Sequence, residues 1–119
     1  MKTIVHIDNS DFFRKVMKTF LREKRYESME CASIAEAQKV LDSGLVSCVI
    51  MGLEFSDAHG VELIKKLVTT NKEIPIIVLT SDENLEHRQK LMLLGVEDYI
   101  LKSMNWQERL EGILKQIFK

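Results

Sequence analysis

The feature that most constrains the fold is an alternation, repeated along the chain, of short apolar runs with amphipathic helical stretches. The first run, Thr3–Ile7, is rich in β-branched residues and lacks a period of 3.6, which is typical of a strand covered on both faces. The other predicted strands are Tyr26–Cys31, which is weaker, Val46–Met51, Ile76–Leu79 and Glu97–Leu101. Because strands and helices alternate, the sequence predicts an α/β domain, a parallel sheet wrapped on both faces by right-handed crossovers.

Helical spacing follows each apolar run. Apolar residues recur every three or four positions from Phe13 to Leu21, as on one face of a helix. Ser33 and Glu36 have the spacing of a capping box, which predicts a helix to about Leu41. The remaining helices are expected over Val61–Val68, Leu85–Leu94 and Trp106–Ile117, the last of them capped by Asn105.

Length and charge limit the classes of function. The 119 residues suit one domain, so we expect residues 1–119 to form a single unit. Seventeen Lys and Arg face eighteen Asp and Glu, which gives no reason to expect a nucleic-acid partner. No run approaches the ~20 apolar residues of a membrane helix, so no membrane partner is expected either. Two cysteines, Cys31 and Cys48, favour reduced thiols and a cytoplasmic location.

Polar residues gather where the predicted strands end. In an open parallel sheet, ligands bind beyond the carboxyl ends of the strands, near the point where the strand order reverses. The residues at these ends should therefore converge on one pocket. They are Asp8 and Asn9 after the first strand, Gly52 and Glu54 after the third, Thr80 after the fourth and Lys102 after the fifth.

The motifs at these strand ends resemble, over the whole chain, the receiver domain of two-component response regulators. The matching segments are Ile7-Asp8-Asn9, Met51 through Gly60, Leu79-Thr80-Ser81 and Asp98-Tyr99-Ile100-Leu101-Lys102. The resemblance implies a doubly wound five-stranded parallel sheet of the flavodoxin-like (CheY-like) type, with strand order 2-1-3-4-5. It also implies a part in bacterial two-component (phosphorelay) signal transduction, without enzymatic activity.

The resemblance assigns roles to the pocket residues. In active receivers, two acids on the first strand and an acceptor Asp on the third hold Mg²⁺, and the acceptor attacks a phosphoryl donor. A hard cation suits such carboxylates, and the cation and a lysine neutralise the phosphoryl group. Asp8 and Lys102 match this pattern. Thr80 would bond a phosphoryl oxygen, and Tyr99 would turn inward behind it.

Three positions depart from the family pattern. Gly52 stands where the acceptor Asp belongs, and glycine has no side chain to act as a nucleophile. Asn9 replaces the second acid, and its amide is a poorer Mg²⁺ ligand than a carboxylate. Ser103 replaces a proline, so we expect a trans peptide before it. We therefore expect no phosphorylation, weak or absent Mg²⁺ binding at the degenerate site of Asp8, Asn9 and Glu54, and no other cofactor.

These departures predict a pseudo-receiver that acts through protein contacts. Its partner would be a sensor kinase, an effector domain or another receiver. Four consecutive apolar helix positions, Leu91–Leu94, cannot all face one core, so at least one must face outward. Leu93 and Tyr99 are the candidate docking residues, on the face from the fourth to the fifth helix that would also serve a homodimer.

Two alternatives stay open. One is a small-ligand or metal-sensing module that uses the vacated pocket, with an anion at Lys102. The other is a normal phosphoryl-accepting receiver whose Asp was mutated to Gly52. Without metal or phosphate we expect Asp8 to pair with Lys102, for which Glu54 and Asp57 are alternative partners. The sequence does not identify the partner or the output, nor whether the chain is part of a longer regulator.

Overall fold

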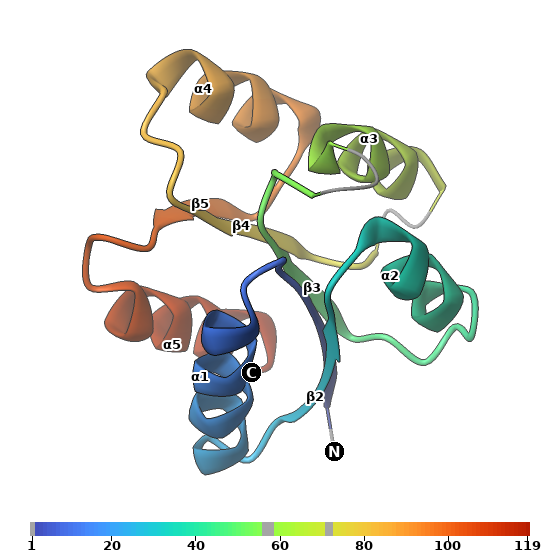
Figure 1. The fold of residues 1–119 in the computed structure, drawn as a ribbon, viewed down its shortest axis with the longest axis vertical. Helices are drawn as coiled ribbons and strands as arrows, with labels where there is room; N and C mark the ends of the chain where they lie inside the picture. Colours follow the sequence, from blue (N-terminus) through green and yellow to red (C-terminus); the bar gives the residue numbers. More distant parts are fainter. Residues whose placement is uncertain (1, 56–58, 71–72) are drawn as a thin grey trace.

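The computed structural model describes residues 2–55, 59–70 and 73–119. Within these ranges five parallel strands form one sheet in the order β2-β1-β3-β4-β5 (Figure 1). The strands are β1 (Thr3–Ile7), β2 (Glu27–Cys31), β3 (Cys48–Met51), β4 (Ile76–Thr80) and β5 (Asp98–Leu101). The predicted α/β class and strand order are confirmed.

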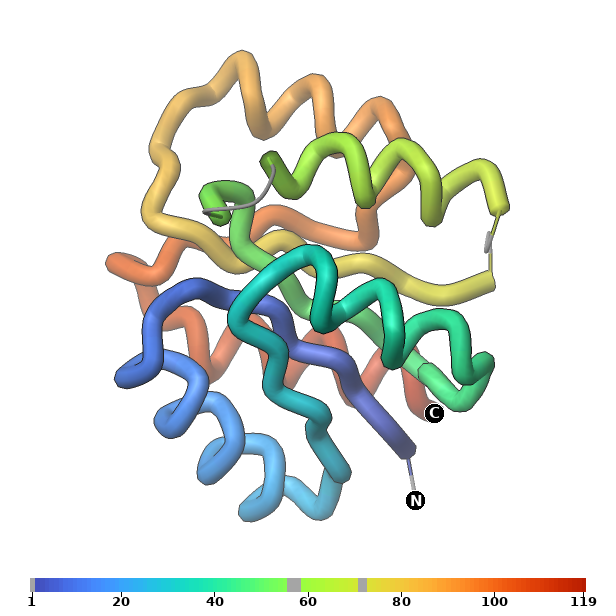
Figure 2. Tube along the Cα trace, turned by 45° about the vertical axis from the view of Figure 1, so that its right-hand side comes forward, coloured from blue at the N-terminus to red at the C-terminus, as the bar shows by residue number. Residues whose placement is uncertain are grey.

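Helices cover both faces of this sheet. They are α1 (Asp11–Glu23), α2 (Ile34–Leu41), α3 (Gly60–Thr70), α4 (Leu85–Leu94) and α5 (Trp106–Ile117). Helices α1 and α5 lie on one face and α2, α3 and α4 on the other (Figure 1), and both chain ends lie at the same end of the molecule (Figure 2). Because the strands are parallel, all of them end at the same edge. No helix in the described ranges is long and apolar enough to cross a membrane.

The core is divided into two clusters by the sheet, because successive side chains of a strand point to opposite faces. The cluster under α1 and α5 includes Ile4, Met17, Ile50, Leu110 and Trp106. The cluster under α2, α3 and α4 includes Val5, Ile7, Val49, Ile64 and Leu91. The central strands are thus buried on both sides, as their apolar runs predicted.

The helix starts confirm one predicted cap and contradict another. The Ser33 hydroxyl accepts a hydrogen bond from the Glu36 N–H at 3.1 Å, and the Glu36 carboxylate accepts one from the Ala32 N–H at 2.7 Å. Asn105 precedes α5, but it has a left-handed backbone with φ of 36° and makes no side-chain bond to the helix. The predicted Asn105 cap is therefore wrong, because a capping side chain normally projects from an extended backbone.

Strand boundaries differ slightly from the prediction. Strand β2 begins at Glu27 and not at Tyr26, because the Tyr26 N–H bonds the Leu21 carbonyl at 2.9 Å in the turn that leaves α1. Strands β3 and β5 also begin later than predicted, whereas β4 extends to Thr80. The extra residue of β4 places Thr80 at the edge of the sheet where the strands end.

Candidate functional site

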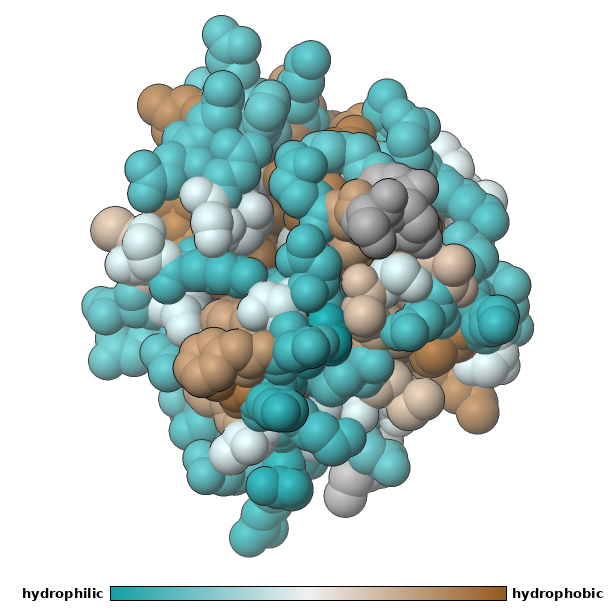
Figure 3. Space-filling view, viewed as in Figure 1, coloured by the Kyte–Doolittle hydropathy of each residue, from teal (hydrophilic) through white to brown (hydrophobic). Residues whose placement is uncertain are grey.

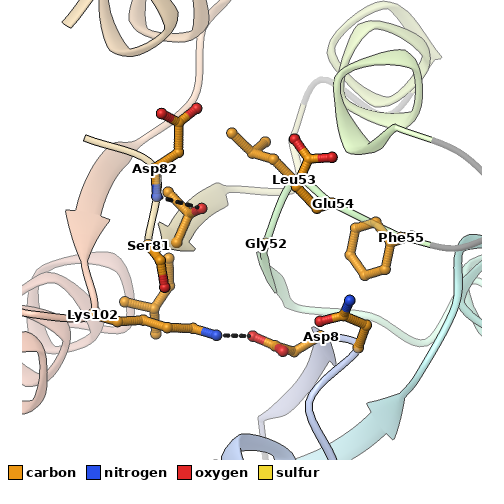
Figure 4. Close-up of a pocket in the computed structure, with 11 residues that line it drawn as sticks. Asp8, Gly52, Leu53, Glu54, Phe55, Ser81, Asp82 and Lys102 are labelled. Carbon is orange, nitrogen blue, oxygen red and sulfur yellow. Dashed lines mark hydrogen bonds and ion pairs between the residues drawn. The ribbon is translucent and has the colours of Figure 1, made fainter. Parts of the chain in front are cut away.

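A pocket of about 330 Å³ lies at the carboxyl edge of the sheet (Figure 4). All six residues predicted to converge there line it: Asp8, Asn9, Gly52, Glu54, Thr80 and Lys102. Leu53, Phe55, Leu79 and Ser81, which belong to the matching segments, line it as well, and Asp82 is a lining residue that the sequence did not single out. The strand ends thus come together as the topology requires.

Asp8 and Lys102 form an ion pair across the pocket. Asp8 is 2% exposed, its Oδ1 accepts the Ser10 N–H at 2.8 Å, and its Oδ2 lies 2.7 Å from Lys102 Nζ (Figure 4). This approach is close but lacks the angles of a directed hydrogen bond, so Oδ2 has charge pairing alone. Lys102 Nζ also lies 4.2 Å from the Phe13 ring centroid. The pairing with Asp8 is therefore the one the structure contains; the alternative partner Asp57 lies outside the described residues.

Gly52 follows β3 directly and contributes only backbone to the pocket. Its N–H donates to the Ile7 carbonyl at 3.0 Å. A Cβ placed on it would lie 3.7 Å from the Leu79 carbonyl oxygen and 3.8 Å from Asp8 Oδ2, which are ordinary contacts. The fold therefore does not require glycine at this position. A side chain at position 52 would enter the pocket beside the Asp8 carboxylate.

Gly60 is a contrasting glycine on the neighbouring segment. A Cβ on Gly60 would lie 2.9 Å from both the Gly52 carbonyl oxygen and Met51 Cε. Contacts this short force neighbouring atoms to move, and one of these atoms belongs to the backbone. Close packing thus explains Gly60, whereas it does not explain Gly52.

The β3 side of the pocket is open. Glu54 has a side chain that is 79% exposed, and its Oε1 lies 3.0 Å from Nε2 of His59, itself an exposed loop residue as predicted. The two residues also form an isolated antiparallel bridge. Asn9 is exposed and carries only a neutral amide. Glu54 is therefore engaged with His59 and not with Lys102.

The pocket residues do not fit the Mg²⁺ site that the family resemblance implies. In the described ranges no group of three His, Cys, Asp or Glu side chains lies close enough together to hold a metal ion. Of the implied ligands, Asp8 pairs with Lys102, Asn9 is an amide and Gly52 has no side chain. Mg²⁺ prefers several charged oxygens in octahedral geometry, and this arrangement does not provide them.

Thr80 and Tyr99 meet at Asp82. Thr80 is 6% exposed, and its Oγ1 accepts the Asp82 N–H at 3.1 Å. Tyr99 is 3% exposed, and its hydroxyl donates to the Asp82 carbonyl at 2.7 Å. Burial raises the pKa of Tyr99 to about 12, and the negative charge of Asp82 adds to the effect. Tyr99 is thus turned inward and adds no exposed side chain to a docking face.

The first turn and outer face of α4 expose apolar side chains. Leu91 is buried, whereas Met92 is 40% exposed and Leu93 is 87% exposed. This confirms that the four consecutive apolar positions cannot all face the core. Leu85 joins Met92 and Leu93 in a shallow surface that also includes Arg88. In Figure 3 apolar patches near α4 are bordered by hydrophilic residues.

Two sets of polar contacts near the sheet were not predicted from the sequence. The first is made by Asp82 with Thr80 and Tyr99. Asp82 lies only two residues after Thr80, so its place just beyond a strand end could have marked it as a pocket residue. His6 is fully buried, as predicted for a core histidine, but its Nδ1 lies 2.6 Å from Oε1 of Glu30 on the neighbouring strand. An alternating pattern in β2, where Glu30 follows Met29, gave no sign of this partner.

The 2-1-3-4-5 sheet, with a polar pocket where β1 and β3 end, defines a CheY-like doubly wound domain. A family model described as the response regulator receiver domain matches residues 4–114. The chain therefore belongs to the receiver domain family of response regulators, which act in two-component systems.

Individual relatives agree with this assignment. The chain is 26% identical over 116 residues to the transcriptional regulatory protein SrrA of Staphylococcus aureus (strain NCTC 8325 / PS 47), covering 95% of this chain and 48% of that protein. It thus spans about half the length of the curated relatives it matches. A solved structure of the response regulator protein TrrA from Thermotoga maritima, in complex with Mg(2+)-BeF, has 28% identity and a TM-score of 0.88, covering 99% of this chain and 100% of that one.

A receiver domain protein from Methanospirillum hungatei supports the fold alone. It has 22% identity and a TM-score of 0.89, covering 98% of this chain and 94% of that one. The predicted CheY-like fold is confirmed by these structures.

Proposed function

We propose that this chain is a pseudo-receiver, a receiver domain that signals through protein contacts without being phosphorylated. The observation that carries the proposal is Gly52, buried at the end of β3 in the position of the acceptor Asp. Phosphoryl transfer to a receiver needs a nucleophile at this place, and glycine offers none. A Cβ at position 52 would make only ordinary contacts, so packing does not account for the glycine. This supports the view that the glycine affects chemistry at the site and not the fold.

None of the three carboxylates that line the pocket is suited to replace the missing acceptor. Asp8 is buried and lies 2.7 Å from the Lys102 ammonium, Glu54 lies 3.0 Å from His59, and Asp82 is bonded to His87 at 2.6 Å. We further propose that Mg²⁺ binds weakly or not at all and that no other cofactor is needed. The ammonium group of Lys102 already neutralises Asp8, the acid that a metal would otherwise neutralise.

The proposed output is contact with another protein. Receiver domains act between kinases and effector domains, and the exposed apolar surface of α4 around Leu93 is a suitable contact site. A sensor kinase, an effector domain or a second receiver is the proposed class of partner, with a homodimer through the face from α4 to α5 as one form. We propose that residues 1–119 act as one non-enzymatic module in this role.

Mg²⁺ and beryllofluoride, the ligands named for Thermotoga TrrA, provide a test. Adding both to the ¹⁵N-labelled protein should leave the amide NMR spectrum unchanged, because no acceptor carboxylate is present. In the variant Gly52→Asp with Asn9→Asp, the signals of residues near Thr80 and Lys102 should shift. New signals in the unsubstituted chain would contradict the proposal, and a silent double variant would show that the pocket residues were wrongly matched.

A small-ligand or metal-sensing role is the second candidate, favoured by the pocket of about 330 Å³. Its lining carries the three acids Asp8, Glu54 and Asp82 against the single cation Lys102, and this net negative charge disfavours the anion considered from the sequence. A titration with Mg²⁺ or phosphate, followed by Trp106 fluorescence, tests this role. Saturable binding at millimolar concentration or below would favour it over the pseudo-receiver.

A further inference from the structure

Asp82 joins three parts of the molecule in the turn between β4 and α4. Each of its polar atoms has a hydrogen-bond partner. The N–H donates to Thr80 Oγ1 at 3.1 Å and the carbonyl accepts from the Tyr99 hydroxyl at 2.7 Å. Oδ1 accepts from the Asn84 N–H at 2.9 Å, and Oδ2 lies 2.6 Å from His87 Nδ1. Asp82 therefore connects the pocket, strand β5 and the first turn of α4.

His87 supplies the contact that ties this turn to a helix side chain. Its side chain is 54% exposed and lies outside both the pocket lining and the core clusters. The Asn84 side chain caps α4 and accepts the His87 N–H at 3.2 Å, which fixes the residue at the start of the helix. Because the acceptor is a carboxylate, Nδ1 is the donor. The hydrogen bond to His87 is the largest cause that lowers the pKa of Asp82.

Tyr99 depends on the placement of Asp82. A buried phenol needs a hydrogen-bond acceptor, and the Asp82 carbonyl is the acceptor in the structure. The same residue is held by its carboxylate, at one oxygen by the adjacent Asn84 backbone and at the other by His87. The bond to Asn84 lies within the turn, so only the bond to His87 reaches a helical side chain.

We propose that His87 is a positioning residue which, through Asp82, holds Tyr99 inward and keeps the start of α4 in one arrangement. This inference rests on the proposed function, because it gives an unphosphorylated receiver a built-in means of setting the Tyr99 side chain. The apolar α4 surface, defined above by Leu85, Met92 and Leu93, would then be presented in one state. Figure 4 shows Asp82 on the pocket wall facing the Gly52 segment, where the turn meets the pocket.

Two tyrosines, Tyr26 and Tyr99, make the state of Tyr99 measurable by NMR of protein labelled with ¹³C in the tyrosine rings. A Tyr26→Phe variant assigns the signals. Replacing His87→Ala should raise the outward population of Tyr99 by a factor of about 2 to 5, the size expected for the loss of a partly exposed ion pair. His87→Gln keeps an N–H donor and should restore the inward signal in large part.

His59 offers a matched control. It too is an exposed imidazole bonded to a carboxylate five residues away, at 3.0 Å from Glu54, but it makes no hydrogen bond to Asp82. His59→Ala should leave the Tyr99 signal unchanged. A Tyr99 signal that is the same in His87→Ala as in the unsubstituted chain would overturn the proposal, as would equal shifts in the two alanine variants.

A thermodynamic cycle adds a readout that does not depend on the NMR signals. The effects of His87→Ala and Tyr99→Phe on urea unfolding should be non-additive if His87 acts on Tyr99, and strict additivity would overturn the proposal. All of these measurements omit a phosphoryl donor. Phosphorylation of the protein would therefore contradict the proposed function but not the role of His87. A Tyr99 signal that is unchanged in His87→Ala would contradict the role of His87 but not the proposed function.

Discussion

The two sides of the pocket use their residues in opposite ways. On the side of β1 and β5, Asp8 and Lys102 are retained and close on one another at 2.7 Å, with Asp8 almost wholly buried. On the side of β3, Gly52 leaves room for a side chain and Glu54 is largely exposed. One side of the pocket is thus closed by a buried ion pair, whereas the other has room for a side chain that the packing of the fold does not exclude.

The largest predicted effect lies on the closed side. Lys102→Met leaves the buried Asp8 carboxylate without a countercharge, and such a loss should cost about 3 kcal/mol of unfolding free energy. Urea unfolding followed by Trp106 fluorescence measures it. Lys115→Met is the matched control, because Lys115 is 74% exposed beside Glu111, and its change should stay below about 0.5 kcal/mol. Equal midpoints for the two variants would show that the buried pair is not stabilising.

The next effect tests which glycine the fold needs. Gly60→Ala should cost about 2 kcal/mol, because the added Cβ would lie 2.9 Å from the Gly52 carbonyl oxygen. Gly112→Ala on α5 has open space around it and should stabilise the protein by about 0.5 to 1 kcal/mol. Thermal unfolding compares the two. A Gly60→Ala variant as stable as Gly112→Ala would mean that the close approach to β3 relaxes without cost.

A smaller effect is expected on the stability of the protein at acidic pH. The hydrogen bond to His87, and then that to the Asn84 backbone, lowers the pKa of Asp82 below its ordinary value of 3.8. A carboxyl group whose folded pKa is lowered stabilises the fold above its unfolded pKa, and this contribution is lost as the pH falls through the folded pKa. Asp82→Asn should therefore lose less stability than the unsubstituted chain between about pH 6 and about pH 3. Identical pH profiles would argue against this role of Asp82.

The smallest effect is expected on the open side. Gly52→Ala should leave the unfolding free energy unchanged or raise it by up to about 0.5 kcal/mol, since its Cβ makes only ordinary contacts. Calorimetry measures the unfolding free energy of this variant and of Gly60→Ala under the same conditions, so that the two can be compared. A loss of about 2 kcal/mol in Gly52→Ala would show that the open side is as tightly packed as its neighbour.

Much of the fold and of the pocket followed from the sequence, because strand ends in a parallel sheet must meet at one edge. That rule brought Asp8, Gly52 and Lys102 together from distant positions. Contacts that depend on the geometry of a single turn did not follow. The bonds from Asp82 to Tyr99 and His87 require one particular path of the backbone, and no periodic pattern encodes it.

The predicted starts of one helix and one strand failed for the same reason, because they depend on the local path of the backbone. Asn105 is a residue type that favours helix caps, yet its backbone is left-handed and its side chain makes no hydrogen bond to the first turn of α5. Tyr26 begins the predicted second strand, but its N–H donates to the Leu21 carbonyl near the end of α1. In both cases a local backbone conformation decided against a residue preference.

Intact mass spectrometry after incubation with a small phosphoryl donor and Mg²⁺ tests most directly the claim that this pocket accepts no phosphoryl group. The unsubstituted chain should keep its mass, while Gly52→Asp with Asn9→Asp, treated alongside it, should gain one phosphoryl group. A gain by the unsubstituted chain on any aspartate would contradict the proposed pseudo-receiver.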